Sequence, residues 1–165
     1  MKKQKGFSLI ELLIVVAIIL IIAAIAIPNL LRSRMAANEA SAVGSVRTIN
    51  TAQVTYSTTY GTGFAPLANL GGPAACAASA ATSCLIDTIL SGGTKSGYTI
   101  TTPAPAAVGT IAAPNVAYSV NAVPVVVGQS GQRSFCSDQS GVIRNDPTGA
   151  APGVPCNTSG LNPIQ

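Results

Sequence analysis

The chain has 165 residues, contains neither His nor Trp, and carries a formal charge of +4 to which Lys2, Lys3 and Lys5 contribute three positive charges. Without these lysines the charges nearly balance, so the basic stripe of a nucleic-acid-binding domain is missing and no specific nucleic acid binding is predicted. The lack of His removes histidine-based triads, and together with the absence of any CxxC pair it removes the common spacings of structural zinc sites. The few acidic residues show no paired-carboxylate pattern. We therefore predict that the chain is not an enzyme and has no catalytic residue, bound metal or cofactor.

A long apolar segment follows this basic start. Residues 7–27 read FSLIELLIVVAIILIIAAIAI and hold a single charge, Glu11. As a helix the segment would be about 31 Å long, which matches the hydrocarbon core of a bilayer. It is apolar on all sides, as a lipid-facing helix is, and the lysines before it favour a cytoplasmic N-terminus. The sequence predicts one membrane-spanning helix.

Pro28 follows the apolar segment and has two interpretations. Proline removes a backbone hydrogen bond and clashes with the preceding turn. It either marks the exit from the membrane or lets the helix bend or melt when subunits pack together. The charged residues beyond it also leave two alternatives open, because a solvated helix face and ion pairs between subunits would both use Arg32, Arg34 and Glu39.

The helical pattern continues over residues 29–60, now with an amphipathic character. Apolar residues recur at steps of three and four, with Gln53 as the one polar interruption, and polar residues fill the other face. Gly61 supplies a stop signal. We predict one nearly continuous helix from about Phe7 to Tyr60, whose second half packs through a narrow stripe: Ala42, Val46, Ile49, Gln53, Tyr56 and Tyr60.

Residues 61–165 have a different texture, with Gly and Pro every few positions that exclude long helices. Short runs rich in Thr, Tyr, Val and Ile predict strands, and a helical turn is possible in between. The fold class is therefore α+β, with a small antiparallel sheet of three or four strands covered by the stripe of the long helix. The tail, 145–165, reads as a loop unless Cys156 tethers it. The predicted strands are 97–102, 116–121, 133–137 and 141–144, and the helical turn is 85–90.

The segment from Lys5 to Pro28, KGFSLIELLIVVAIILIIAAIAIP, closely resembles the class III leader of type IV prepilins. That family has a short basic leader that ends in Gly, then Phe, then an apolar helix with Glu as the fifth residue after the cut. Gly6, Phe7 and Glu11 occupy these places here. The resemblance implies that a prepilin peptidase cleaves between Gly6 and Phe7 and that Phe7 is N-methylated.

The resemblance also implies a division of the chain. Residues 1–6 would be a cleaved leader, 7–28 the transmembrane and filament-core helix, and 29–60 the amphipathic half of that helix. Residues 61–165 would form a globular domain on the periplasmic side or on the filament surface. The membrane segment would carry the subunit assembly residues Phe7, Glu11 and Pro28.

The position of Glu11 has a physical argument of its own. A charged side chain near the start of a membrane span costs a few kcal/mol or more, and an ordinary anchor gains nothing from it. Inside a filament, the carboxylate would pair with the new amino group of Phe7 on a neighbouring chain.

The N-terminal segment has two other interpretations. An ordinary secretory signal would use Ala24-Ile25-Ala26 as an A-x-A-like cleavage site, but its apolar region would be too long and would contain an acid. A plain signal anchor would hold a periplasmic domain in the membrane. The spacing of Gly6, Phe7 and Glu11 argues against both.

The four cysteines, an even number behind an export-type N-terminus, predict disulfide bonds in an oxidising compartment. Four cysteines permit three connectivities. We favour the two sequence-local pairs, Cys76 with Cys84 and Cys136 with Cys156. The second would join the tail to the last strands, similar to the closed C-terminal loop of pilins.

The function that follows from the resemblance is a type IV pilin, a structural subunit that polymerises into a helical pilus and supports adhesion, motility or DNA uptake. Its partners would be further copies of itself, the prepilin peptidase, and the inner-membrane assembly platform with its ATPase. It would wait in the inner membrane as a single-pass protein and then enter an extracellular pilus. The alternatives are a type II secretion pseudopilin and a monomeric membrane-anchored binding module.

Overall fold

The computed structural model describes residues 7–73, 75–153, 156 and 161–164. The chain divides into two compact units, Met1–Arg34 and Met35–Gln165, which we call the anchor unit and the head unit. Helix α1, Leu9–Tyr60, contributes to both. The predicted continuous helix is confirmed, and it runs through Pro28 without a break, so Pro28 is not a helix boundary.

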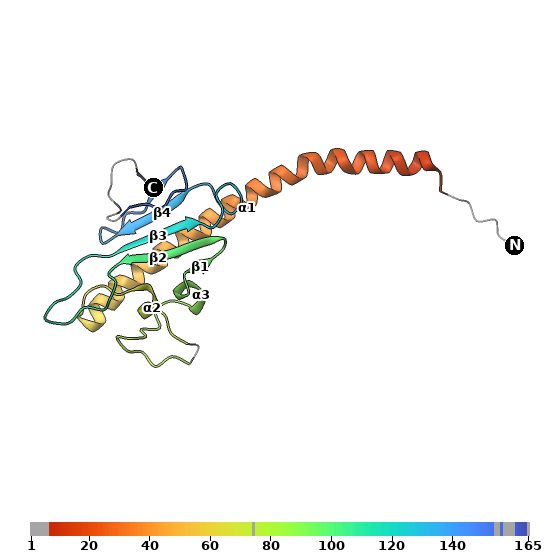
Figure 1. Cartoon of the computed structure of the whole chain (residues 1–165). Coiled ribbons are helices and arrows are strands. Elements are labelled where there is room, and N and C mark those ends of the chain that lie inside the picture. The colour runs from red at the N-terminus through yellow and green to blue at the C-terminus, as the bar shows by residue number, and fades with distance from the viewer. Residues whose placement is uncertain (1–6, 74, 154–155, 157–160, 165) are drawn as a thin grey trace. The chain divides into compact units, whose positions relative to one another are not determined.

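The head unit contains one six-stranded antiparallel sheet in which every strand pairs with its neighbour in sequence (Figure 1). The strands are β1 Thr94–Lys95, β2 Tyr98–Ala104, β3 Ser119–Pro124, β4 Ser134–Asp138, β5 Arg144–Asp146 and β6 Asn162–Pro163. Two short helices, α2 Leu67–Leu70 and α3 Thr88–Ser91, lie between α1 and the sheet in sequence. The α+β class and the antiparallel sheet are confirmed.

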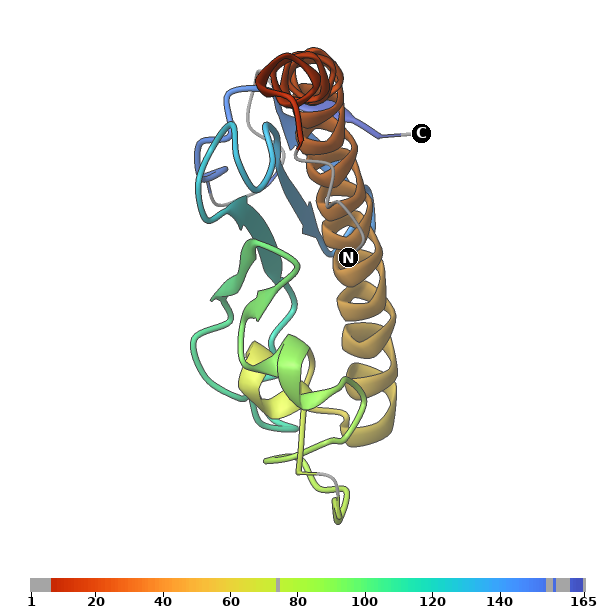
Figure 2. The ribbon, with the colours of Figure 1, turned by 90° about the vertical axis from the view of Figure 1, so that its right-hand side faces the viewer.

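The core of the head unit lies between one face of the sheet and the second half of α1 (Figure 2). Every member of the predicted stripe is buried except Tyr60, which is half-buried. The helical spacing of three and four puts these side chains on one side of α1, where they meet alternate residues of the strands. The largest fully buried apolar side chains are Ile49 and Tyr56 of α1, Leu70, Leu90, Tyr98, Ile100 and Phe135.

The opposite face of the central strands is covered by the C-terminal segment. Asn121 of β3 donates a side-chain hydrogen bond to the carbonyl of Pro152, 3.0 Å away. Ser134 of β4 donates to the carbonyl of Ala150. All of β4 is therefore buried, although its side chains alternate between the two faces.

The predicted sheet was too small. The two additional strands, β1 and β6, have two residues each, which is too short for any alternation to show. The hairpin between β1 and β2 does have a local signal: Ser96 and Gly97 form its turn with φ of 50° and 74°, and two successive positive φ angles are the type I′ arrangement for which Gly is favoured.

Other predicted boundaries were displaced. The strands expected at 116–121 and 141–144 begin later, as β3 and β5, and the helical turn expected at 85–90 is α3, which Asp87 caps by accepting a hydrogen bond from the Leu90 N–H. The tail is not simply a loop, because β6 pairs with β5 and the Ile164 N–H donates to the Ile143 carbonyl. Helix α2 was not predicted.

Candidate functional site

The N-terminal segment is the first part of the candidate site. Phe7 is 77% exposed, and α1 begins two residues later. The Ser8 backbone N–H donates to a Glu11 carboxylate oxygen at 2.9 Å. Glu11 thus occupies the third position of the first turn and satisfies a backbone donor that has no partner within the helix, as the acid of a capping box does. The Ser8-x-x-Glu11 spacing is the sequence signal of this contact, and it was missing from the predictions above. Gly6 lies outside the described residues.

The apolar surface of the anchor unit is open on all sides. From Phe7 to Arg34 each residue is exposed except Ala23, which is half-buried. By length and composition α1 can cross a membrane near its N-terminal end. An apolar helix of this kind requires a bilayer or neighbouring helices around it. Arg32 and Arg34 are exposed at the end of this unit.

Pro28 changes the hydrogen bonding of this helix. It has no N–H to donate to the carbonyl four residues earlier, that of Ala24, yet the helix continues. One carbonyl in the anchor unit is thus left without its usual partner in the helix. Membrane exit and a bend in a packed filament both stay predictions for Pro28.

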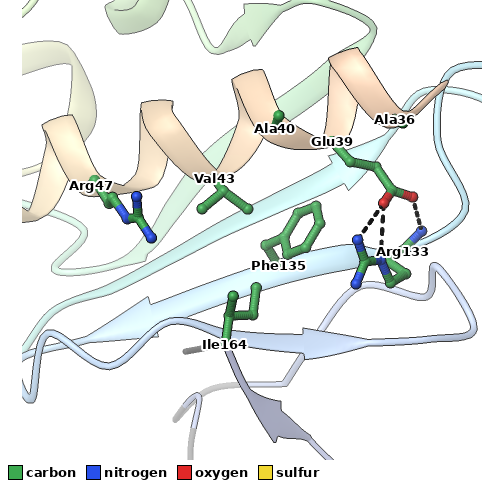
Figure 3. Close-up of a pocket in the computed structure, with 8 residues that line it drawn as sticks. All are labelled: Ala36, Glu39, Ala40, Val43, Arg47, Arg133, Phe135 and Ile164. Atoms are coloured by element: carbon green, nitrogen blue, oxygen red, sulfur yellow. Dashed lines mark hydrogen bonds and ion pairs between the residues drawn. The ribbon is translucent and has the colours of Figure 1, made fainter. Parts of the chain in front are cut away.

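The head unit contains an ion pair between Glu39 and Arg133 (Figure 3). Of the two interpretations left open for Glu39, the solvated helix face is wrong, because this residue is only 9% exposed and pairs within the chain. One of its oxygens accepts from the backbone N–H groups of Gln132 and Arg133, at 2.9 and 3.1 Å. The other accepts from Nε and an Nη of Arg133, at 2.9 and 2.7 Å. The second half of α1 is thereby fixed to the start of β4.

The electrostatics of this pair agree with its geometry. Burial by itself raises the pKa of Glu39, but the hydrogen bonds from Gln132 and Arg133 and the charge of Arg133 outweigh it, so that the pKa lies below its ordinary value of 4.5. The Arg133 guanidinium also lies 5.6 Å from the centre of the Phe135 ring, within cation–π range. A carboxylate held by four donors is structural and has no role as a general base.

A hollow of about 290 Å³ opens beside this pair. Apolar side chains of Val43, Phe135 and Ile164 lie between Glu39–Arg133 at one end and Arg47 at the other (Figure 3). Among the described residues no cluster of three or more His, Cys, Asp or Glu could hold a metal ion. This hollow supplies no set of groups for catalysis.

Gln53, the one polar residue in the predicted apolar stripe, connects the end of α1 to the loop that follows it. Its side-chain amide is fully buried, donates to the Ala65 carbonyl at 2.6 Å and accepts from the Ala65 N–H at 2.9 Å. Both polar ends of the amide are satisfied by one residue of the following loop, which removes the cost of burying them.

The structure pairs the cysteines locally, Cys76 with Cys84 and Cys136 with Cys156. The two bridges differ in exposure. Cys136 and Cys156 are completely buried, where the C-terminal segment covers the sheet, whereas Cys84 is exposed and Cys76 half-buried.

This difference predicts the order of reduction. Thiol–disulfide exchange requires access to a sulfur atom, so under native conditions dithiothreitol should open Cys76–Cys84 at least about tenfold faster than Cys136–Cys156. Alkylation at timed intervals followed by peptide mapping measures both rates. In guanidinium chloride the rates should converge, and equal rates in the native protein would contradict the burial argument.

Known proteins match part of the chain. Residues 1–27 fit the family model described as the prokaryotic N-terminal methylation motif. The chain is 64% identical over 39 residues to the type IV wide pilus major component PilA4 of Thermus thermophilus, which covers 24% of this chain and 30% of that protein. It is 44% identical over 54 residues to the type IV major pilin protein PilA of Myxococcus xanthus, which covers 33% of this chain and 24% of that protein.

The matched region is therefore less than a third of the length of either relative. No solved structure matches the chain. The methylation-motif match falls on the segment with the Gly6-Phe7 junction, Glu11 and the exposed apolar helix, and behind it lies an antiparallel sheet packed on the same helix. The chain thus carries a prokaryotic N-terminal methylation motif and a stretch similar to type IV pilins, and it has an α+β head unit behind its apolar helix.

Proposed function

We propose that the chain is a structural subunit of a type IV pilus, a non-enzymatic protein that polymerises through its N-terminal helix. The observation that carries this proposal is the combination of the methylation motif over residues 1–27 with an apolar helix whose side chains are exposed in all directions. A single copy of this helix needs lipid around it, and a bundle of copies would bury the same surface.

The proposed processing removes residues 1–6. A prepilin peptidase would cleave between Gly6 and Phe7 and methylate the new amino group of Phe7. Residues 7–28 would then form the filament core, with 29–60 as the amphipathic half of the helix and 61–165 as the surface domain. The Glu11 carboxylate would pair with the Phe7 amine of a neighbouring subunit.

The proposed location changes with assembly. The subunit would first be held in the inner membrane by its single apolar span, and an assembly platform driven by an ATPase would then move it into a pilus on the cell surface. Adhesion, motility or DNA uptake would be properties of the assembled filament.

The test is to shear surface filaments from cells, image them by electron microscopy and analyse their subunit by mass spectrometry. We expect long filaments built from this chain, with N-terminal Phe7 carrying one methyl group, and no filaments after deletion of the gene. An N-terminus at Ile27 would show that a conventional signal peptidase had acted and would rule the proposal out.

Two other outcomes identify the alternatives. Intact surface filaments combined with failed protein secretion in the deletion strain would identify a type II secretion pseudopilin. Intact filaments, intact secretion and a subunit that stays monomeric in the membrane would identify an anchored binding module.

A further inference from the structure

Three consecutive valines are exposed in the loop that joins β3 to β4. Val125, Val126 and Val127 are 57%, 45% and 47% exposed. Apolar residues scattered singly on a surface are ordinary, but a contiguous exposed group marks an interaction site more often. We call Val125–Val127 the valine tip.

The valine tip is held in a defined conformation. The Val126 N–H donates to Ser130 Oγ at 3.0 Å, and that hydroxyl donates back to the Val126 carbonyl, also at 3.0 Å. The Gly128 N–H donates to the Gly131 carbonyl at 2.9 Å, and the Val125 N–H donates to the Gly97 carbonyl at 3.0 Å. The exposure of the valines is therefore a property of an ordered turn.

The loop that carries the valine tip contains no acid of its own. Residues 125–133 include no Asp or Glu, and their one charge is Arg133. The acid that contacts this loop, Glu39, is buried and receives four hydrogen bonds. An apolar surface that approaches the valines therefore meets no carboxylate from their own loop. A turn of another segment packs on Val127 through Gly149, and its acid, Asp146, accepts hydrogen bonds from Thr148. The charge of the half-exposed Arg133 is balanced by Glu39.

The position of the tip along the chain indicates its partner. Asn38 donates to the Ser130 carbonyl at 2.8 Å, so the loop lies at the start of the head unit. In sequence, Asn38 follows Arg34, the last residue of the anchor unit, by four positions. Four residues span at most about 14 Å even when fully extended. Whatever the angle between the two units, Asn38 and its loop stay close to the end of the apolar span, where the exposed Arg32 and Arg34 also lie.

We propose that, before assembly, the valine tip docks on the phospholipid interface of the membrane that holds the apolar span. This proposal rests on the membrane anchoring proposed above. The valines enter the boundary between headgroups and acyl chains, while the exposed Arg32 and Arg34 at the end of the apolar span lie near the phosphates. The head unit is then held against the bilayer at a second point besides its helix, and that contact has to be released when the subunit enters a filament.

The chain has no Trp, so one introduced Trp gives a clean signal. We would reconstitute full-length Val126→Trp into phosphatidylcholine vesicles with and without bromine on the acyl chains. Bromine quenches a Trp that reaches the acyl region, and we expect at least a twofold loss of fluorescence. Val125→Trp should behave in the same way, and it keeps the test valid if one substitution disturbs the turn.

Two control variants separate the possible outcomes. Ile111 is 81% exposed, more than any residue of the valine tip. It lies in the turn that Thr110 forms with Ala113, and two residues after that turn Asn115 bonds to Thr62, beyond the end of α1. If exposure alone governed the contact, Ile111→Trp would be quenched most, whereas docking predicts no quenching there. Ile18→Trp, in the apolar span, reports the anchoring itself.

Quenching of Ile18→Trp without quenching of either valine variant would overturn the docking and leave the anchoring intact. No quenching at Ile18 would overturn both. A valine-tip Trp that is unquenched in vesicles but shielded from iodide in purified filaments would show that a second copy of the chain occupies this surface instead, which also overturns the proposal.

Discussion

Glu11→Leu is expected to abolish most filament formation while leaving the subunit in the membrane. The substitution makes the apolar span more hydrophobic, so insertion should not suffer, and Glu11 belongs to the anchor unit and has no described contact in the head unit. What is lost is the proposed pair with the Phe7 amine of a neighbouring subunit. Breaking one desolvated ion pair costs about 3 kcal/mol or more, which is about a hundredfold in an association constant. The yield of sheared filaments beside a membrane blot measures the effect.

The contact between Glu11 and the Ser8 N–H provides a matched control. Glu11→Gln keeps a side chain that can accept from this N–H, because Gln also serves in a capping box, but it carries no charge. If the ion pair is the requirement, Gln and Leu should fail alike. A normal filament yield from Glu11→Gln and a low one from Glu11→Leu would show that capping of the helix is what matters. Normal yields from both would rule out the pairing mechanism.

Glu39→Ala is expected to destabilise the head unit by about 2 kcal/mol. Hydrogen bonds to a charged group contribute about 1.5–3 kcal/mol each, but the half-exposed Arg133 can be rehydrated, which reduces the total. The midpoint of thermal unfolding should fall by roughly 5–10 °C. All the tyrosines, Tyr56, Tyr60, Tyr98 and Tyr118, belong to the head unit and the chain has no Trp, so tyrosine fluorescence of the full chain in detergent reports this unit alone. An unchanged midpoint would contradict the structural role of the pair.

The pH dependence separates charge from packing. Because the pKa of Glu39 in the folded state lies below 4.5, its ionised form stabilises the fold above that value, and this contribution is lost as the pH falls through the folded pKa. The stability difference between wild type and Glu39→Gln should be constant near neutrality and shrink below pH 4.5. The pKa values of Asp87 and Asp146 are also lowered, by hydrogen bonds from Leu90 and Thr148 respectively. Wild type and Glu39→Gln both retain these two carboxylates, so their contribution cancels in the difference. A difference that persists unchanged into acid would show that the charge contributes nothing.

Much of the fold could be predicted because its signals are local. The apolar run of residues 7–27 and the spacing of three and four up to Tyr60 specify a helix with one buried face, and that is what α1 is. Glu39 lies three positions before Ala42, so the same spacing placed it on the buried face. Its charge instead suggested a solvated face or an ion pair between subunits.

What the sequence could not provide were partners distant along the chain. Nothing near Glu39 points to Arg133, and the amide of Gln53 is satisfied by the backbone of Ala65, which any residue type could supply. Strands of two residues exist because a longer neighbour pairs with them, so β1 and β6 have no pattern of their own. The cover of the sheet by the C-terminal segment likewise depends on main-chain carbonyls, which leave no trace in the side-chain pattern.

The two edge strands of the sheet bear on whether head units can pack side by side without their sheets joining. An open strand edge invites addition of a strand from another molecule, and short edges and proline reduce that risk. Here the outermost strands have two residues each, and Pro163 in β6 lacks an N–H to offer. Many copies could therefore stand side by side at high local concentration, on a membrane or along a fibre, without merging their sheets. The contacts that hold the copies together would then be made by the apolar helices, and a fibre built this way could dissociate into intact, reusable subunits.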